Sequence, residues 1–528
     1  MNQQLERILQ RVTKPARYIG GEHGEIVKGE RELTFALCFP DTYEVGMSNL
    51  GIQILYAVLN GLEGVACERC FLPWPDMTAE LKSAGVPLYT LETSRALADC
   101  EIIGFSLAYE LSYPSMLNML ELGGVAPYAA DRDEDAPLVI AGGVCTVNPE
   151  PFSKFIDLAV IGDGEDVIVE LIDCYRKYRS FGKTRLLREL AEIEGVYVPV
   201  FEGNVRAVKR RAVRDLNTSV YPTAPVVPST EVIHDRTVQE IMRGCPNGCK
   251  FCQACFTNAP VRYKSAEVAA RQAIASLKHS GCKEVNLSSL STSDYPELGE
   301  LTDTLLDYCK PRYINLSLPS LRANSFTFDL LDKVQQTRKS GLTFAPEAGS
   351  QRLRDHINKN LSEEDILTAC TTAFAAGHTS VKLYFMIGLP GETDDDLHAI
   401  ADLAHKILRC GSKRVNITVS ASCFVPKPRT PFENEPQNPI EELERKQRLL
   451  RDILRDKHIR FRWHDARVSH IEYLLAQGKS DLAPALLAVA QKSRGPQAWD
   501  EFFDFALWRE QLTVNSEQIT ETGEGQNA

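Results

Sequence analysis

The sequence predicts an α/β protein with two successive parallel sheets, and three observations lead to this expectation. In the first third of the chain, short apolar strands alternate with helical stretches, which is typical of a parallel sheet with helices on both faces. A second alternation of the same kind runs from Val238 to about Phe432. After Pro439 apolar residues recur at helical spacing, so the C-terminal part is expected to be helical.

Five apolar runs are the expected strands of the first sheet. They are Leu33–Phe39, Val65–Leu72, Ile102–Leu107, Leu138–Ala141 and Leu158–Ile161. Helical patterns such as Asn49–Leu59 and Glu165–Tyr178 separate them. Two strands lead into glycine-rich turns, Gly142-Gly143 and Gly162 to Glu165. Because open α/β sheets bind ligands at the carboxyl ends of their strands, we expect a crevice at this edge.

The second alternation contains six expected strands. They are Val238–Met242, Glu284–Leu287, Tyr313–Leu318, Gly341–Ala345, Ser380–Met386 and Asn416–Ser420. Strand–helix units of roughly 30 residues fit this span. Such an array forms either an open partial barrel or a doubly wound sheet, and periodicity alone does not choose between them.

Five parts of the chain follow from these patterns. They are an N-terminal segment 1–30, a Rossmann-like domain 31–185, a linker 186–232, a second α/β core 233–432 and a C-terminal helical region 433–528. Three prolines between Tyr221 and Pro228 favour an extended linker. The aromatic residues from Trp499 to Trp508 are interpreted as packing of a helical cap.

The composition is that of an ordinary globular protein, with 44% apolar and 25% charged residues. No apolar run reaches the length of a membrane span, and Met1–Arg17 has no signal-peptide pattern. We therefore expect a cytoplasmic location and no membrane partner. The net charge of −12 argues against a protein that coats nucleic acid, which would carry a basic footprint.

A cluster of cysteines is the most informative motif. Cys245, Cys249 and Cys252 have the spacing C-x3-C-x2-C, directly after an expected strand and around the turn-forming residues Pro246 to Gly248. So tight a loop lets three thiolates converge on one small inorganic cluster. A cubane held by four cysteines has every iron blocked, whereas three ligands leave one iron open to an exogenous ligand.

The alternative is a structural zinc site. Structural zinc normally needs two ligand pairs separated by a longer loop, and no second C-x2-C pair follows downstream. Cys67 and Cys70 form such a pair upstream, but within an expected strand of the other domain. Cys255 is interpreted as a nearby free thiol, because a fourth ligand would close the site.

The cysteine spacing, with the aromatic Phe251 before the last cysteine, resembles the signature of the radical S-adenosylmethionine (SAM) superfamily. Three further segments match it, each after an expected strand: Ser288–Asp294, Ala345–Ser350 and Met386–Thr393. The resemblance covers Arg243 to roughly Phe432 and implies a (β/α)6 partial barrel. It also implies a [4Fe–4S] cluster on the three cysteines and SAM as cofactor.

The resemblance assigns roles to individual residues around SAM. Ser288 and Ser291 lie where the family contacts the amino group, and Glu347 matches the ligand of ribose or amine. Lys359 matches the cation for the carboxylate, where relatives often have Arg, and Gly388 matches the residue that lets backbone approach adenosine. From the residues alone, Glu347 could be a helix N-terminal carboxylate and Gly388 part of a plain turn.

The implied reaction is reductive cleavage of SAM to a 5′-deoxyadenosyl radical, with an external one-electron donor of the flavodoxin or ferredoxin type. No residue is identified as acid or base toward the substrate. The substrate is either a small molecule or a tRNA, rRNA or ribosomal protein that receives a methyl or methylthio group. A non-catalytic iron–sulfur sensor is a third class, disfavoured because a sensor needs no SAM pocket.

Two basic stretches bear on RNA as a substrate. The first holds Arg206, Lys209, Arg210, Arg211 and Arg214, and the second holds Arg445, Lys446, Arg448, Arg451, Arg455, Lys457, Arg460 and Arg462, with Phe461 and Trp463 among them. Basic residues interleaved with aromatic rings suit phosphates and stacked bases. A solvated helix face paired with neighbouring acids is the preferred interpretation.

The N-terminal sheet resembles the cobalamin-binding-type domain of one branch of radical SAM proteins. The residues that carry this resemblance to a corrin site are Ser106, Gly142, Gly143 and Gly162. The pattern departs at Tyr43, which stands where a cobalt-binding histidine would be expected, and a phenol is a poor neutral ligand. Either cobalamin binds without a histidine from the protein, or the domain has lost it. The first is preferred, because the glycine turns remain.

Overall fold

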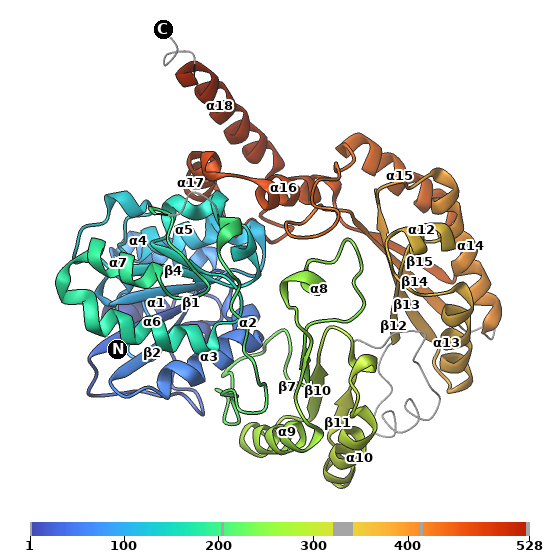
Figure 1. The fold of residues 1–528 in the computed structure, drawn as a ribbon, viewed down its shortest axis with the longest axis horizontal. Helices are drawn as coiled ribbons and strands as arrows, with labels where there is room; N and C mark the ends of the chain where they lie inside the picture. The colour runs from blue at the N-terminus through green and yellow to red at the C-terminus, as the bar shows by residue number, and fades with distance from the viewer. Residues whose placement is uncertain (1–2, 202–204, 320–341, 412–414, 524–528) are drawn as a thin grey trace. The chain divides into compact units, whose positions relative to one another are not determined.

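The computed structural model describes residues 3–201, 205–319, 342–411 and 415–523, with side-chain environments as far as residue 514. The chain forms two compact units (Figure 1). Unit 1 contains Met1–Val213, Ser219–Asp235 and Leu474–Ala528, and unit 2 contains Arg214–Thr218 and Arg236–Tyr473. The segment expected as a C-terminal helical region is therefore divided between the two units at Tyr473.

Unit 1 is built on a six-stranded sheet in the order β2-β1-β3-β4-β5-β6. The strands are β1 (Leu33–Phe39), β2 (Val65–Phe71), β3 (Ile102–Ser106), β4 (Leu138–Gly142), β5 (Leu158–Val160) and β6 (Val196–Tyr197). The first five pair in parallel, which confirms all five expected strands, and β6 pairs antiparallel to β5. Since β6 and the end of α7 (Lys183–Ala191) lie in the expected linker, part of that linker belongs to the sheet domain.

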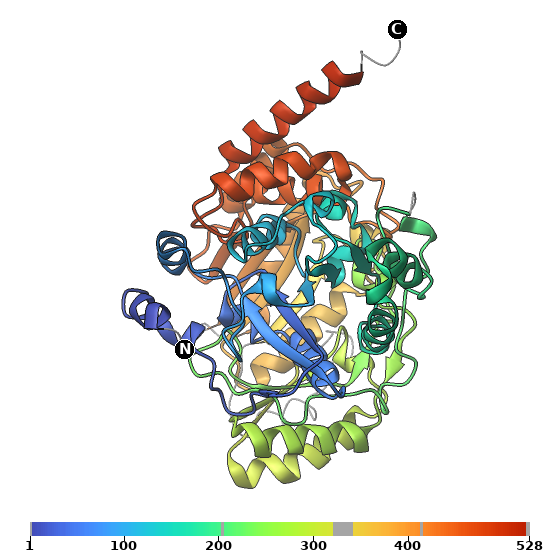
Figure 2. The ribbon, with the colours of Figure 1, turned by 90° about the vertical axis from the view of Figure 1, so that its left-hand side faces the viewer.

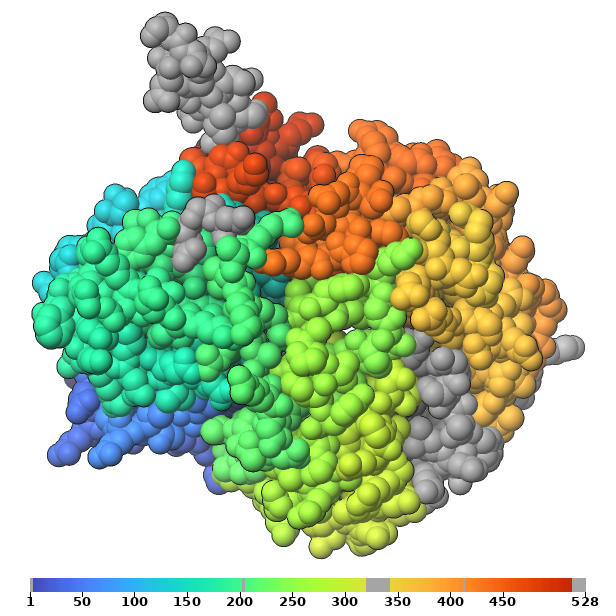
Figure 3. Space-filling view, viewed as in Figure 1, coloured from blue at the N-terminus to red at the C-terminus, as the bar shows by residue number. Residues whose placement is uncertain are grey.

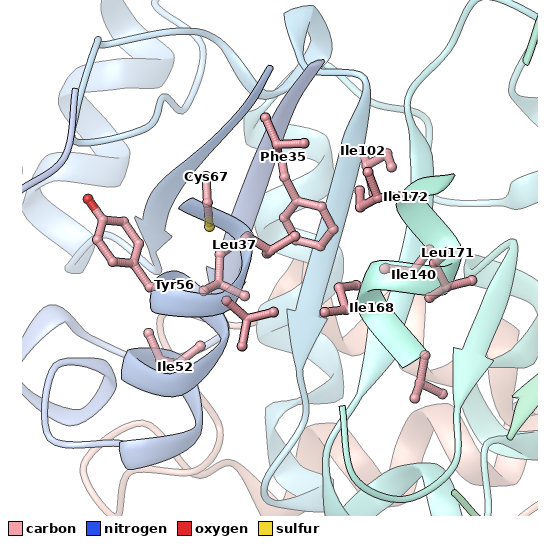
Figure 4. Packing of buried hydrophobic residues seen from close by; sticks show 14 of the residues in the cluster. Phe35, Leu37, Ile52, Tyr56, Cys67, Ile102, Ile140, Ile168, Leu171 and Ile172 are labelled. Atoms are coloured by element: carbon pink, nitrogen blue, oxygen red, sulfur yellow. The ribbon is translucent and has the colours of Figure 1, made fainter. Parts of the chain in front are cut away.

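The sheet of unit 1 is buried on both faces. All residues of β1 are buried, as expected for a strand covered by helices on both sides. Phe35 and Leu37 of β1 pack with Ile52 and Tyr56 of α3 (Leu50–Asn60), and Ile168 of α6 (Glu165–Tyr178) closes the same core (Figure 4). The other helices of this part are α1 (Gln3–Leu9), α2 (Tyr43–Gly46), α4 (Pro75–Ala84) and α5 (Tyr113–Leu122).

The C-terminal segment folds back onto unit 1. Helix α17 (Ala483–Lys492) contacts α5, so that segments far apart in sequence lie side by side (Figure 2). In the space-filling view the red atoms near the C-terminus adjoin the cyan atoms of the N-terminal part (Figure 3). The Trp499 ring meets that of Trp74 edge to face at 5.3 Å, and Trp508 at the start of α18 (Phe505–Gly523) is fully buried. These aromatic residues are packing, as expected.

Unit 2 contains two parallel sheets. One has the order β11-β10-β7 and the other β12-β13-β14-β15, and every pair in both is parallel. The strands are β7 (Thr237–Glu240), β10 (Glu284–Ser288), β11 (Asn315–Ser317), β12 (Leu342–Glu347), β13 (Ser380–Ile387), β14 (Asn416–Cys423) and β15 (Ile459–Trp463). The six expected strands are confirmed; Gly341, expected to begin one of them, lies outside the described residues.

The strand β15 corrects the expectation of an entirely helical C-terminal region. The residues Ile459 and Phe461 pack against the core of the four-stranded sheet, whereas Arg460 and Arg462 are exposed. This alternation has the period of a strand, and all of β15 pairs with Ile417 to Ala421 of β14. Pairing with β14 therefore makes Ile459–Trp463 a strand, although the segments before and after it are helices.

Helices cover one face of the four-stranded sheet (Figure 1). They are α13 (Glu363–Ala375), α14 (Asp394–Cys410) and α15 (Ile440–Ile453), and their apolar residues share one core with Val381, Leu383, Ile417 and Val419. The three-stranded sheet packs against α9 (Ala266–Ser280) and α10 (Leu298–Cys309). None of the described helices is both long and apolar enough to cross a membrane.

Candidate functional site

The three-cysteine loop lies between the short strand β8 (Met242–Arg243) and helix α8 (Gln253–Thr257). At Gly244, where φ is 92°, a Cβ atom would lie 2.8 Å from the carbonyl oxygen of Asn258. Gly248 also has a positive φ, 64°. Only glycine adopts such turns without strain, so these residues let the loop fold tightly. Cys249 is buried, and Cys245 and Cys252 are half-buried.

The thiol of Cys255 lies among the other three. It forms hydrogen bonds with the thiols of Cys245, Cys249 and Cys252, and these contacts raise its own pKa. The same hydrogen bonding lowers the pKa of Cys245 to about 5 and that of Cys252 to about 7. The thiolate is the form that binds metal, so the loop presents ligand-competent sulfurs near neutral pH. Among the described residues, no three His, Cys, Asp or Glu side chains are placed to hold a single metal ion.

Asn358 connects this loop to the segment that follows β12. Its Nδ2 donates to the carbonyl oxygens of Asn247 at 3.2 Å and of Gly248 at 2.9 Å. The backbone N–H of Lys250 donates to the carbonyl oxygen of Ile357 at 3.0 Å. Residues about 110 positions apart are thus joined, and the sequence analysis assigned no role to Asn358.

Glu347 and Lys359 form an ion pair beside this connection. The Nζ atom of Lys359 lies 3.1 Å from Oε1 of Glu347, and both side chains are 15% exposed. Glu347 ends β12 after a register shift and has φ of 68°, an uncommon conformation for a residue with a Cβ. Burial raises the pKa of Glu347, and Lys359 opposes that shift. The structure therefore brings together Glu347, which the resemblance assigned to the ribose or amine of SAM, and Lys359, which it assigned to the carboxylate.

The loop after β10 is tied to the cysteine loop through Asp294. Its Oδ2 accepts from Ser291 Oγ at 2.6 Å and from Asn247 Nδ2 at 2.8 Å. Ser291 is buried, so its hydroxyl serves this network. The carbonyl oxygen of Ser288, the last residue of β10, accepts from the N–H of Ile241 at 3.1 Å. Asp294 was not singled out from the sequence, although its spacing from Ser291 is that of a local hydrogen-bonded turn.

Phe251 and Gly388 lie where loops meet at the carboxyl ends of the four-stranded sheet. Phe251 packs on a small apolar cluster that includes Ala348, Leu389 and Phe424, which follow β12, β13 and β14 respectively. Gly388 has φ of 78°, and a Cβ there would lie 2.9 Å from Leu443 of α15. Packing of the turn against α15 is sufficient to explain this glycine.

In unit 1, Tyr43 stands at the position where a cobalt-binding histidine would be expected. It is 2% exposed. Its hydroxyl donates to Glu22, and it accepts from the N–H of Ser229 at 3.2 Å. Glu22 in turn pairs with the buried Arg69 at 2.6 Å. Burial, followed by the charge of Glu22, raises the pKa of Tyr43, so the phenol stays neutral and is held inside the protein.

In the glycine turns of unit 1, backbone atoms of the chain lie against two of the glycines. Gly143 has φ of 99°, and a Cβ there would lie 2.5 Å from the carbonyl oxygen of Leu107. Gly162 has φ of 115°, and its Cβ position is blocked by the carbonyl oxygen of Arg211. At Gly142 the same position is open. Two of the three glycines expected to face a corrin are therefore required by contacts within the polypeptide. Ser106, the last residue of β3, is half-buried.

These observations define an α/β protein with two parallel-sheet units and a cysteine-rich loop at the start of the second. Two family models match the chain: "Radical SAM proteins, N-terminal" over residues 51–199 and "Radical SAM superfamily" over residues 240–404. The chain belongs to the radical SAM superfamily.

Curated relatives resemble the chain at modest identity. An uncharacterized protein of Methanocaldococcus jannaschii is 27% identical over 460 residues, which is 85% of this chain and 90% of that protein. The tRNA-2-methylthio-N(6)-dimethylallyladenosine synthase of Pelotomaculum thermopropionicum is 26% identical, over 46% of this chain and 54% of the synthase. The ribosomal protein uS12 methylthiotransferase RimO of Desulforudis audaxviator is 26% identical, over 56% of this chain and 72% of that enzyme.

Solved structures share the fold. The radical SAM methyltransferase TsrM of Kitasatospora setae, described with tryptophan substrate and a SAM analog, has a TM-score of 0.52 at 13% identity. That match covers 92% of this chain and 100% of TsrM. The cobalamin-dependent radical SAM enzyme OxsB has a TM-score of 0.51 at 16% identity, over 70% of this chain and 51% of OxsB. At these identities the likeness concerns the fold.

Proposed function

We propose that this chain is a radical SAM enzyme that holds a [4Fe–4S] cluster on Cys245, Cys249 and Cys252. When bound, the cluster and SAM supply a 5′-deoxyadenosyl radical that abstracts hydrogen from a substrate, after reduction by an external donor of the flavodoxin or ferredoxin type. The protein's part in such chemistry is binding, orientation and exclusion of water.

The observation that carries this proposal is the junction between the cysteine loop and the Glu347–Lys359 pair. Asn358 bonds directly to the loop, and Lys359 follows it in the chain. A half-buried acid–base pair is thereby connected to the loop that carries the three thiols. This arrangement suits a zwitterionic amino acid cofactor, because Lys359 can meet a carboxylate and Glu347 an amine or ribose hydroxyl.

The acid–base pair also weighs against a non-catalytic iron–sulfur sensor. A sensor needs ligands for its cluster, but it has no use for a half-buried carboxylate with positive φ near them. Backbone strain of this kind tends to be retained where function requires it. We therefore prefer an enzyme to a sensor.

Two relatives act on tRNA and on a ribosomal protein according to their names, and the same substrates are the alternative for this chain. The basic stretches give this alternative little support. Arg445 pairs with Asp394 at 2.7 Å, and Arg455 pairs with Asp452 at 2.7 Å. In the other stretch Lys209 pairs with Glu194 at 2.9 Å. Charges already neutralised by carboxylates bind phosphates poorly, so a small-molecule substrate is preferred.

Cobalamin is not part of the proposed reaction. Tyr43 is hydrogen-bonded to Glu22 and Ser229. Backbone carbonyl oxygens of the chain lie where Cβ atoms of Gly143 and Gly162 would be. Tyr43 is thus not available as a cobalt ligand, and contacts within the chain explain Gly143 and Gly162 without a corrin. We propose that unit 1 serves to hold substrate or a partner.

The decisive experiment is cleavage of SAM by anaerobically reconstituted protein. After reduction with dithionite, we expect 5′-deoxyadenosine and methionine, formed slowly even without substrate. The matched control is the triple variant of Cys245, Cys249 and Cys252 to alanine, under the same reduction. Iron-loaded, reduced protein that binds SAM but forms no 5′-deoxyadenosine would favour the sensor.

A further inference from the structure

Among the described helices, α13, α14 and α15 pack on one face of the four-stranded sheet of unit 2, and residues of the opposite face are partly exposed. Along β13, Val381 and Leu383 are buried toward the helices, whereas Lys382 is half-buried and Tyr384 is 40% exposed. On β15, Arg460 and Arg462 alternate with the core residues Ile459 and Phe461. Since alternate residues of a strand point to opposite faces, the two arginines point to the face opposite the helices.

The strand register places these cations close together. Lys382 is directly opposite Thr418 of β14, and Thr418 is opposite Arg460 of β15. Arg460 and Lys382 are thus two strand spacings apart, about 10 Å, and Arg462 is about 7 Å along the strand from Arg460. Arginine and lysine side chains are long enough to converge across such distances. Hydroxyl groups of Tyr384, Thr418 and Ser420 lie on the same face.

These cations differ from the other basic residues of this region. No ion pair within the described part of the chain includes Lys382, Arg460 or Arg462, and the ammonium of Lys382 donates to the hydroxyl of Tyr384 at 2.6 Å. On α15, by contrast, Arg445, Lys446 and Arg448 pair with carboxylates, and so does Arg455 after the helix. Lys382, Arg460 and Arg462 therefore place positive charge on one sheet face without a carboxylate partner among the described residues.

We propose that this face binds the phosphate groups of a small phosphorylated molecule. Two arginines and a lysine supply charge-assisted, partly bidentate hydrogen bonds to phosphate oxygens, and the hydroxyl groups can donate to the remaining oxygens. That this ligand is the substrate of the radical reaction rests on the proposed function.

The limited extent of the charge decides between a small ligand and RNA. An RNA strand makes many successive phosphate contacts along a continuous basic groove. Here the flanking basic residues of α15 are neutralised, so only one cluster of phosphates is accommodated. A mono- or pyrophosphate group matches three converging cations.

Inorganic pyrophosphate is a suitable probe. Its binding to the reconstituted protein, without reductant, can be measured by titration calorimetry. We expect the double variant Arg460→Gln/Arg462→Gln to weaken binding roughly tenfold or more, because each arginine contributes charge-assisted hydrogen bonds. Lys382→Met, on the central strand, should weaken it as well. The matched control, Arg445→Gln/Arg448→Gln, removes the same charge from α15 and should leave the Kd unchanged.

Four outcomes would overturn the proposal. They are the absence of pyrophosphate binding, equal losses in the β15 and α15 variants, competition of pyrophosphate with SAM, and tighter binding of a single-stranded RNA oligonucleotide that also depends on Arg460 and Arg462. Because the measurement needs no radical chemistry, failure of SAM cleavage would leave it valid. Conversely, if the phosphate site is disproved, the proposed function is not affected, but its substrate class is then unassigned.

Discussion

The carboxylate of Glu347 and the ammonium of Lys359 lie 3.1 Å apart, at the two ends of the turn and helix that follow β12. Asn358, next to Lys359, holds the cysteine loop by two hydrogen bonds. One short segment therefore positions both the charged pair and the backbone that carries the thiols. The predictions below test these connections separately.

The cysteines differ in their expected contribution to the cluster. Alanine in place of Cys245, Cys249 or Cys252 should each abolish iron and sulfide incorporation, because each supplies one thiolate. Cys255→Ala should retain close to four iron per chain, because the other three cysteines hold the cluster and its fourth iron has no cysteine ligand. Iron and sulfide analysis with absorbance spectroscopy measures this, and Cys282→Ala is a control. Loss of the cluster in Cys255→Ala alone would contradict the open-iron site, and tight zinc without iron would support the zinc alternative.

The Glu347–Lys359 pair should control SAM affinity. Glu347→Ala and Lys359→Ala should each weaken SAM binding about tenfold or more with iron content intact, because each removes a charge-assisted contact. Equilibrium binding of SAM to the oxidised protein measures the effect. Unchanged affinity in both variants would remove these residues from the SAM site.

The pH dependence of SAM binding should reflect Glu347. Its folded-state pKa is raised by burial, so the carboxylate becomes protonated at a higher pH than an ordinary glutamate. Affinity that needs the ionised form is present above that pKa and is lost as the pH falls through it. In Glu347→Gln this loss should disappear. A wild-type pH profile that the Gln variant reproduces would show that another group is responsible.

Asn358→Gly tests the connection between the two loops. Glycine tolerates the left-handed backbone at this position, where φ is 56°, so the variant removes the amide while avoiding strain. Loss of two hydrogen bonds, each worth about 1 kcal/mol, should release iron roughly thirtyfold faster under a chelator challenge. Asn360→Gly, also at a positive φ, controls for the backbone effect of glycine. Equal rates in the two variants would assign no special role to Asn358.

The glycines of unit 1 should matter for folding rather than for a corrin. Gly143→Ala and Gly162→Ala should destabilise the protein by about 1–3 kcal/mol each, because both have a positive φ and blocked Cβ positions. Gly142→Ala, with open space, is the matched control and should be tolerated. Denaturant unfolding of protein without cobalamin measures this.

Cobalamin binding can be tested directly on the wild-type protein. After incubation with hydroxocobalamin and gel filtration, we expect none to be retained, because Tyr43 offers no cobalt ligand and contacts within the chain explain Gly143 and Gly162. A stoichiometric complex would contradict this. Paramagnetic resonance would then show whether a histidine nitrogen coordinates the cobalt.

Much of the architecture was predictable from the sequence, because it depends on local periodicity. Runs such as Leu33–Phe39 are apolar throughout, and burial on both faces of a parallel sheet requires such a run. The cysteine loop was recognisable for a similar reason: three thiols can converge only if their spacing is short. Such features depend on residues that are close together in the sequence, so they can be predicted without knowing the distant contacts.

Tertiary structure alone decided the features that depend on residues distant in sequence. Arg460 and Arg462 looked like part of a basic helix, but pairing with β14 made them members of an open sheet face. Gly143 and Gly162 looked like ligand-binding turns, but the carbonyl oxygens of Leu107 and Arg211 occupy their Cβ positions. The hydrogen bonds of Asn358 to the cysteine loop could not be predicted from the sequence, because its partners lie about 110 residues away. Periodicity reports which face of an element is buried, whereas packing determines what that face meets.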